Sequence, residues 1–294
     1  MAGKSDDRMM IVIPSTKRTY KQITLAHLRR YKMADRACLV VPHDEHKRYV
    51  HEHGEKVRIE ATPPEIVGIS KTREWIMTVL PDMIEARYVF MLDDDMDYCY
   101  RPDIADPKLK MIETAEKMKE MLDTIENWMR VDGFEHVGLS ARQGNNRPFY
   151  DAQKVYGLHK YRDATRMMNA YAYDTRFIRD MVRAKKIVLG RLPVMEDFDL
   201  TLQLLRLGYP NRVSFEFCWN QRSSGAEGGC SSYRTYEMQA DAANRLADFH
   251  PGFVKRVTKE SKATSESWKG MKQRIDVNVF WRKAFDTSGK KLPS

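Results

Sequence analysis

The sequence predicts an α/β fold in which a mixed, mostly parallel sheet is flanked by helices. Short apolar runs with β-branched or aromatic residues occur at residues 9–13, 37–41 and 88–92, as expected for buried strands. Amphipathic segments lie between and after them, and the longest expected helix spans residues 107–130. Its apolar residues repeat at helical spacing, which indicates that one face packs against a core. With 294 residues the chain can form one large domain or two small ones.

Four carboxylates follow the third of these expected strands within five positions, as Asp93, Asp94, Asp95 and Asp97. Clustered carboxylates repel one another and raise one another's pKa. A divalent cation such as Mn²⁺ or Mg²⁺ relieves that repulsion, because it takes oxygen ligands and also binds substrate phosphates. Ligands of open α/β sheets bind beyond the carboxyl ends of the strands. The pattern therefore predicts a metal-assisted site, although aspartates that only cap a turn and a following helix would give a similar sequence.

The composition is that of a globular protein, with 42% hydrophobic and 10% aromatic residues. The sequence contains no run of 18 apolar residues, and its first residues lack the apolar core of a signal peptide. We therefore expect no membrane span. The cysteines show no metal-ligand spacing, so we interpret them as reduced thiols in a cytoplasmic protein: Cys38, Cys99, Cys218 and Cys230.

The net charge of +9 is concentrated near the C-terminus. Residues 251–294 hold 11 Lys and Arg against 4 Asp and Glu, whereas residues 1–250 hold 39 against 37. A basic segment interleaved with aromatic residues suits a polyanion such as nucleic acid. An extension that folds back onto the rest of the chain is an equally good interpretation. The aromatic residues in question are Trp268, Phe280, Trp281 and Phe285.

The end of the first expected strand carries residues suited to a phosphate group. Pro14 and Ser15 close the strand, and Arg18 follows in the turn. A strand that leads into such a turn can bind phosphate through backbone N–H groups and positive charge.

Two later segments have the same character. Ser70 is a natural N-cap, so we expect a helix to begin there and to aim Ser70 and Arg73 towards an anion. The Gly/Ser-rich segment 221–234 ends in Arg234 and is suited to closing over a bound phosphate ester. An unstructured connection would have the same composition.

A second acidic stretch opens an expected helix after residue 195. Glu196, Asp197 and Asp199 would lie in its first turn, where negative charge stabilises the helix dipole. Three acids in four residues exceed what capping requires. We therefore expect that one of them acts as a general base.

The order of these motifs resembles that of GT-A glycosyltransferases over residues 9–220. The shared features are the Pro-Ser turn, the Gly-Ile-Ser-x-x-Arg helix start, the Asp-x-Asp strand end and the later Glu-Asp helix start. The resemblance implies a Rossmann-like catalytic domain at residues 1–250 and a basic extension at residues 251–294. It also implies that Asp93 and Asp95 hold Mn²⁺ or Mg²⁺ on the diphosphate of a UDP-sugar donor.

The same resemblance implies roles for the remaining residues. Asp197 would take the proton of the acceptor hydroxyl, with Glu196 beside it. Many members give the metal a late histidine, but the first histidine after residue 217 is His250, so no third protein ligand is assigned. The nucleotide-sugar would be contacted by Pro14, Ser15, Arg18, Ser70, Arg73, Asp94 and Arg234.

A narrower resemblance is to bacteriophage glycosyltransferases of the TET-associated type, which modify hydroxymethylated pyrimidines in DNA. It rests on Glu-Asp-x-Asp at 196–199 and on Gly-Gly-Cys-Ser-x-Tyr-Arg-Thr at 228–235. It implies a DNA acceptor, with Arg142, Asn145 and Arg147 near the accepting base or its flanking phosphates. The lack of an expected membrane anchor agrees, because a typical polysaccharide synthase carries transmembrane helices.

Other functions fit parts of the sequence. A GT-A enzyme could act on a saccharide or protein acceptor instead of DNA. A nucleotidyltransferase or two-metal nuclease would also combine clustered aspartates with a basic surface, and it would act on DNA without a sugar nucleotide. A non-catalytic DNA-binding protein would explain the basic extension but would leave the acidic cluster without a role.

Overall fold

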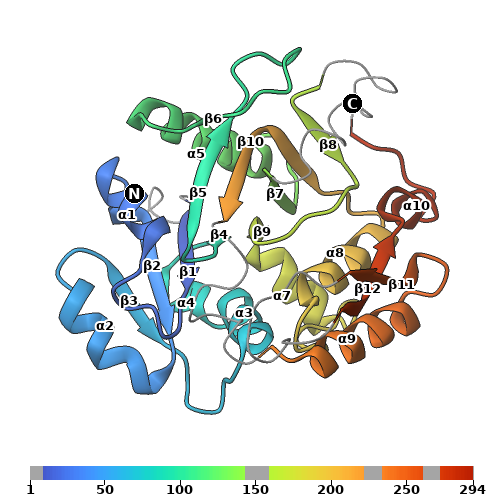
Figure 1. The fold of residues 1–294 in the computed structure, drawn as a ribbon, viewed down its shortest axis with the longest axis horizontal. Helices are drawn as coiled ribbons and strands as arrows, with labels where there is room; N and C mark the ends of the chain where they lie inside the picture. The colour runs from blue at the N-terminus through green and yellow to red at the C-terminus, as the bar shows by residue number, and fades with distance from the viewer. Residues whose placement is uncertain (1–8, 143–158, 222–233, 261–271, 294) are drawn as a thin grey trace.

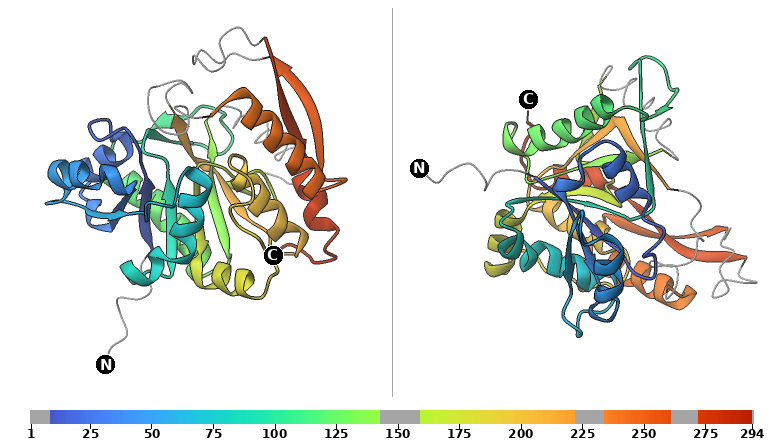
Figure 2. Two further views of the ribbon diagram at one scale, coloured as in Figure 1. Left: turned by 90° about the horizontal axis from the view of Figure 1, so that it is seen from below. Right: turned by 90° about the vertical axis from the view of Figure 1, so that its left-hand side faces the viewer.

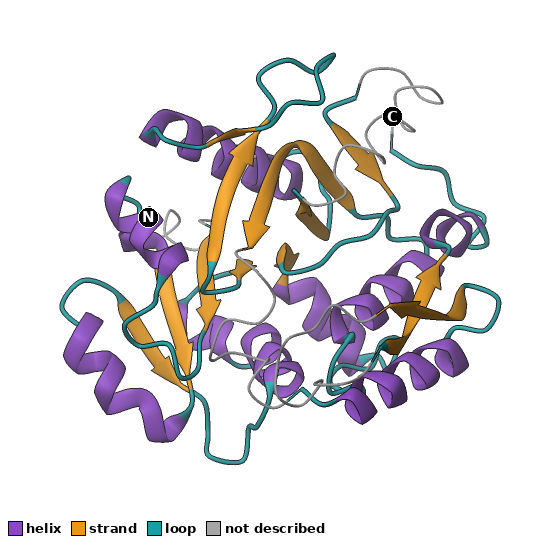
Figure 3. Cartoon of the chain, viewed as in Figure 1, coloured by secondary structure: helices purple, strands orange, loops and turns teal. Residues whose placement is uncertain are grey.

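The computed structural model describes residues 9–142, 159–221, 234–260 and 272–293. A ten-stranded sheet crosses the molecule, and helices cover both of its faces (Figure 1, Figure 3). The strand order is β3-β2-β1-β4-β9-β7-β10-β5-β6, and β8 pairs with β10. The strands are β1 (Met10–Pro14), β2 (Ala37–Val41), β3 (Arg58–Ala61), β4 (Tyr88–Leu92), β5 (Met96–Tyr100), β6 (Lys110–Met111), β7 (His136–Ala141), β8 (Tyr161–Asp163), β9 (Ala170–Asp174) and β10 (Arg212–Gln221).

Most strands of the sheet run in one direction. β1 is parallel to β2 and β4, β2 is parallel to β3, and β10 is parallel to β7. β9 runs against both β4 and β7, and β5 and β8 run against β10. The prediction of a mixed, mostly parallel sheet flanked by helices is confirmed. As a consequence, the carboxyl ends of β1, β4, β7 and β10 meet at one edge of the sheet.

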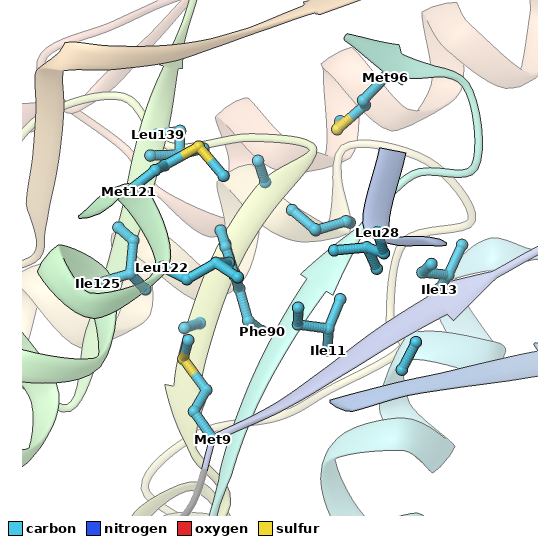
Figure 4. Packing of buried hydrophobic residues seen from close by; sticks show 14 of the residues in the cluster. Met9, Ile11, Ile13, Leu28, Phe90, Met96, Met121, Leu122, Ile125 and Leu139 are labelled. Carbon is cyan, nitrogen blue, oxygen red and sulfur yellow. The ribbon is translucent and has the colours of Figure 1, made fainter. Parts of the chain in front are cut away.

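Two apolar layers enclose this sheet, because alternate residues of each strand face opposite sides. Ile11 and Phe90 pack with helices α1, α2 and α5 (Figure 4), whereas Val12 and Met91 pack with α3, α4, α7 and α8. The helices are α1 (Ile23–Arg30), α2 (His46–His53), α3 (Ile69–Thr78), α4 (Leu80–Ile84), α5 (Ala115–Arg130), α7 (Thr175–Arg183) and α8 (Glu196–Arg206), with short 3₁₀ turns at Ala34–Arg36 and His43–Glu45.

The helix expected over residues 107–130 begins later in the structure than the sequence predicted. It begins at Ala115, after Thr114, whose side chain caps it by accepting the Lys117 N–H at 3.2 Å. The preceding Lys110 and Met111 pair with β5 and add a short edge strand. The expected apolar face is confirmed and its residues are buried: Met118, Met121, Leu122, Ile125 and Trp128.

The chain after β10 forms a smaller unit that packs on the outer side of α8. It comprises α9 (Tyr236–Phe249), the antiparallel ribbon of β11 (Val254–Glu260) and β12 (Gln273–Val279), and α10 (Trp281–Asp286). A third apolar cluster joins Leu202 and Leu205 of α8 to Leu246 of α9, Val277 of β12 and Phe285 of α10. The described part of residues 251–294 therefore folds back onto the chain.

Trp268, which we expected among the aromatics of this segment, lies outside the described residues. The boundary at residue 250 remains a prediction. Within the described ranges, no helix is both long enough and apolar enough to cross a membrane.

Candidate active site

The acidic turn at residues 93–95 connects the carboxyl end of β4 to the start of β5, at the sheet edge where β1, β7 and β10 also end. Thr24 of α1 fixes its backbone. The Thr24 hydroxyl donates to the Asp93 carbonyl at 2.5 Å and accepts the Met96 N–H at 3.1 Å, and the Thr24 N–H donates to the Asp94 carbonyl at 3.1 Å. These bonds hold three successive carboxylates in one tight bend. Asp97 lies in β5 and pairs with His27 at 2.8 Å instead.

Arg18 binds two of the three carboxylates. Its Nη1 lies 2.5 Å from Asp94 Oδ1 and 2.7 Å from Asp95 Oδ2. Ser15, directly after the buried Pro14 at the end of β1, donates to Asp94 Oδ2 at 2.5 Å. Burial raises the pKa of Asp94 to about 6, although Arg18 and Ser15 oppose the shift. The phosphate-binding candidates of the first strand thus lie at the acidic turn and bind its side chains.

Arg73 of α3 joins the acidic turn to the Glu-Asp helix start. It donates from Nη2 to Asp93 Oδ1 at 2.8 Å, and its Nη1 contacts the Glu196 carboxylate. Its guanidinium also lies 5.2 Å from the centre of the Tyr171 ring. Burial lowers the pKa of Arg73, but Tyr171, Glu196 and Asp93 together raise it well above its ordinary value. Arg73 therefore remains charged between two carboxylates that are 103 positions apart in the sequence.

Ser70 does not cap α3, contrary to the prediction. The cap residue is Gly68, two residues earlier and with a φ of 84°, and the helix begins at Ile69. Glycine reaches this conformation without a steric penalty, so the chain turns into the helix before Ser70. Ser70 is buried within the first turn, and its hydroxyl has no hydrogen-bond partner among the described residues.

Asp197 is the buried acid of the second motif. It is the second residue of α8 and only 9% exposed, and its Oδ1 accepts the Phe198 N–H at 2.9 Å. Burial and the neighbouring charge of Glu196 raise the pKa of Asp197 to about 7, with Arg73 opposing the shift. A carboxylate with a near-neutral pKa can take up and release a proton at physiological pH, as a general base must.

Asp199 has a different environment and a structural role. It accepts hydrogen bonds from Arg191 at 2.7 and 2.5 Å, and from His250 Nε2 at 2.7 Å. Arg206 lies 3.2 Å from the other ring nitrogen of His250, and because a guanidinium only donates, that nitrogen accepts. Both nitrogens of the buried His250 are therefore used to join α8 to the end of α9.

The residues expected to contact the acceptor are only partly described. Arg142 directly follows β7; its N–H donates to the Trp219 carbonyl at 2.7 Å and its side chain is exposed. Asn145 and Arg147 lie outside the described residues, as does most of the Gly/Ser-rich segment. Arg234, at the end of that segment, donates to Gln239 of α9.

Gln221 is a site residue that the sequence analysis missed. It is the last residue of β10, and its amide donates to Asp95 Oδ1 at 2.8 Å. Asn169, just before β9, donates to the Gln221 side chain at 3.4 Å. In the sequence Gln221 only begins the Gly/Ser-rich segment, and its pairing with Asp95 spans 126 residues, so no local pattern indicates it.

The acidic turn presents oxygen ligands without a preformed metal cage. Among the residues that the structure describes, no group of three or more His, Cys, Asp or Glu side chains is arranged to hold a metal ion. The proposed metal ligands, Asp93 and Asp95, are instead neutralised by Arg73 and Arg18.

The comparison with protein families decides the class of the enzyme. The family described as TET-Associated Glycosyltransferase matches residues 9–229, which covers most of the chain and includes both acidic motifs. The chain belongs to this family. It is a glycosyltransferase, as the motif order had predicted.

Two characterised phage enzymes are similar to this TET-associated glycosyltransferase. Both are named beta-glucosyl-HMC-alpha-glucosyl-transferase, one from Enterobacteria phage T2 and one from phage T6. Each is 26% identical over 215 residues, which is 71% of this chain and 70% of the relative.

Two solved structures match this chain at low similarity. Glucosyl-3-phosphoglycerate synthase from Mycobacterium tuberculosis, in complex with Mg²⁺ and UDP, has a TM-score of 0.45 and 12% identity, covering 87% of this chain and 85% of that one. The 4-diphosphocytidyl-2C-methyl-D-erythritol synthase from Anaerococcus prevotii has a TM-score of 0.42 and 12% identity, covering 74% of this chain and 89% of that one.

Proposed function

We propose that this glycosyltransferase moves a sugar from a UDP-sugar onto a hydroxymethylated pyrimidine in DNA. The observation that carries the proposal is the contact of Arg73 with both Asp93 and Glu196. It brings the acidic turn, suited to a diphosphate, next to Asp197, suited to proton transfer. Binding the diphosphate of a sugar-nucleotide donor requires the acidic turn, and taking the proton from an acceptor hydroxyl requires Asp197.

The donor would bind at the sheet edge, where β1 and β4 end. Arg18 and Arg73 are charged, and each already binds oxyanions, so both can bind the oxygens of a diphosphate. The unpartnered hydroxyl of Ser70 lies one helical turn before Arg73 and can add a hydrogen bond. Asp94 would contact the ribose, Pro14 and Ser15 would line the same edge, and Arg234 would approach from the adjoining segment.

The chemistry of the turn fits a divalent cation. Asp93 and Asp95 come from one bend and offer hard oxygen ligands, and Mg²⁺ in nucleotide enzymes commonly takes one or two carboxylates plus substrate phosphates. Two protein ligands therefore suffice, and His250 is not needed. When bound, Mn²⁺ or Mg²⁺ would supply positive charge that stabilises the departing diphosphate.

Asp197 would act on the acceptor side. The acceptor oxygen forms a bond to the anomeric carbon, the bond from that carbon to the diphosphate breaks, and the acceptor proton passes to Asp197. The raised pKa of Asp197 suits this role, because a base whose pKa lies near the working pH transfers protons most effectively. Glu196, held by Arg73, fixes the start of the helix that carries Asp197.

The names of the phage relatives support a hydroxymethylated DNA acceptor, since both name HMC. A base within a duplex would have to leave the base stack to reach Asp197, at a cost of a few kcal/mol. Arg142, Asn145 and Arg147 are candidates for contacts to that base or its flanking phosphates. The free thiols of the buried Cys38, Cys99 and Cys218 support a cytoplasmic setting.

The test is a matrix of UDP-sugars and DNA substrates in the presence of Mn²⁺, read by mass spectrometry of the nucleosides. The substrates are unmodified DNA, hydroxymethylcytosine DNA and DNA whose hydroxymethylcytosine already carries glucose. We expect a sugar to be added to at least one hydroxymethylated substrate and never to unmodified DNA. The proposal is wrong if no substrate gains a sugar, or if DNA is cleaved or extended without any sugar nucleotide.

A further inference from the structure

The β11–β12 ribbon has two faces of opposite character. Residues directly opposite one another in an antiparallel pair point to the same side. Val254 with Val279, and Arg256 with Val277, form the inner side, where the valines join the apolar cluster with α9 and Arg256 binds Asp248.

The other side, which we call the outer face, is polar and mainly basic. It consists of Lys255, Val257, Lys259, Arg274, Asp276 and Asn278. Lys259 and Arg274 lie opposite one another and each approaches Asp276 to 3.2 Å, which confirms that these side chains share a side. Three cations thus face one carboxylate, and the exposed Lys272 precedes β12. The ribbon projects from the body of the molecule in both views of Figure 2.

The chain directly after the ribbon packs on the helix start that carries Asp197. Trp281, just after β12, packs edge-on against Phe198 at 5.1 Å, and Phe198 follows Asp197 directly. Arg166 lies 5.2 Å from the centre of the same Phe198 ring. It interacts electrostatically with Asp197 in the site and with Asp276 on the outer face. Arg166 is therefore near enough to interact with both Asp197 and the outer face.

We propose that the outer face of the β11–β12 ribbon, together with Arg166, binds the phosphate backbone of the acceptor DNA beside Asp197. This inference rests on the proposed function. The match is one of charge and length: Lys255 and Lys259 are four strand positions apart, about 13 Å, which corresponds to the axial rise of about four base pairs of DNA. A nucleotide-sugar with a single diphosphate would be too short to use this row. The ribbon supplies affinity and leaves base recognition to the site.

The test compares two triple variants that remove the same charge. The ribbon variant is Lys255→Gln, Lys259→Gln and Lys272→Gln. The control is Lys47→Gln, Lys56→Gln and Lys119→Gln, at exposed positions in or near α2 and in α5, away from the ribbon in Figure 1. Binding of hydroxymethylated duplex DNA is measured by fluorescence anisotropy at several salt concentrations between about 50 and 200 mM.

We expect the ribbon variant to bind DNA more weakly. The slope of the logarithm of the DNA-binding constant against the logarithm of the salt concentration should become shallower by about two to three, because each lost phosphate contact removes about 0.9 from it. The control should keep the wild-type slope. Binding of UDP should be equal in all three proteins. A further variant, Asp276→Asn, removes the only acid of the outer face and should bind DNA more tightly than wild type.

The inference would be overturned if the ribbon variant and wild type had the same salt slope. It would also be overturned if the control variant lost as much DNA affinity as the ribbon variant. Transfer to the free hydroxymethyl nucleoside separates this inference from the proposed function. If the wild type modifies the nucleoside and the ribbon variant loses only DNA binding, both hold. If the wild type modifies DNA but the ribbon variant keeps the wild-type salt slope, only the ribbon inference is wrong. If the wild type modifies neither substrate, the proposed function is wrong, and the slopes still decide the ribbon.

Discussion

Arg73 Nη2 lies 2.8 Å from Asp93 Oδ1, and this ion pair connects the helix that follows the third strand to the turn that follows the fourth. The other arm of the same guanidinium contacts Glu196. Arg73 is thus the residue through which the two acidic motifs become one site.

Replacing Arg73 should destabilise the protein strongly. Arg73→Met would leave Asp93 and Glu196 without their cation, and breaking a buried ion pair typically costs about 3–5 kcal/mol. Chemical unfolding of the purified variant measures the decrease in the free energy of unfolding. The matched control is Arg179→Met, because its partner Asp82 is 74% exposed to water and the pair should be worth less than about 1 kcal/mol. Equal losses in both variants would refute the bridging role.

Asp197→Asn should separate proton transfer from donor binding. The amide keeps the size of the side chain and can still accept the Phe198 N–H, but it is not a base. We expect kcat to fall by about 10²–10⁴-fold, the usual range for loss of a general base, with the KM for the donor little changed. A raised KM at unchanged kcat would instead make Asp197 a binding residue and would favour Glu196 as the base.

The pH dependence of stability provides an independent test of the environment of Asp197. Its pKa is raised from 3.8 to about 7 in the folded protein, so between these values the folded state holds a proton that the unfolded state has released. Stability from this group is therefore present at low pH and is lost as the pH rises. Asp197→Asn cannot titrate. The free energy of unfolding of wild type, minus that of the variant, should fall between about pH 4 and 7; a constant or rising difference would contradict the assignment.

Asp199→Asn should behave in the opposite way to Asp197→Asn. Asp199 binds Arg191 and His250 in the interior, so the change should cost stability, of the order of 3–5 kcal/mol, while activity per folded molecule is largely retained. Thermal unfolding and transfer rates measured below the melting temperature provide the comparison. Loss of activity without loss of stability would place Asp199 in the chemistry.

The local part of the site could be predicted from the sequence, because its signals are contiguous. The apolar run 88–92 followed at once by Asp93–Asp95 fixes both a buried strand and the acidic turn at its end. Likewise, Glu196 and Asp197 stand directly before the apolar positions of α8. Such patterns depend only on neighbours in the chain.

The remaining contacts could not be predicted, because they are made across the fold. The bond from Gln221 to Asp95 and the contact from Arg73 to Glu196 join segments that are more than a hundred residues apart. Serine is a favourable N-cap, but Gly68, with its greater conformational freedom, caps the helix two residues before Ser70. In these cases the tertiary arrangement prevailed over the local preference.

The C-terminal segment shows the limit of an argument from charge. Its basic composition is real, but Phe285 is 1% exposed and packs with Leu205 and Leu246 in the third apolar cluster. In the ribbon of β11 and β12, Val254 and Val277 are buried on the inner side, whereas Lys255 and Lys259 are exposed on the outer face, so the ribbon has an apolar side and a basic side. The two interpretations of this segment are therefore compatible.

The most direct test of the central claim is formation of the sugar-modified nucleoside by wild type and by Asp95→Asn on the same hydroxymethylated DNA. Asp95 is buried and binds Arg18 and Gln221, so the variant loses some stability, and both proteins are compared below the melting temperature of the variant. We expect wild type to add a sugar with Mn²⁺ or Mg²⁺ present and to stop in excess EDTA, and we expect Asp95→Asn to form almost no product at saturating donor. Wild-type rates of product formation by Asp95→Asn, or by wild type in EDTA, would contradict the account.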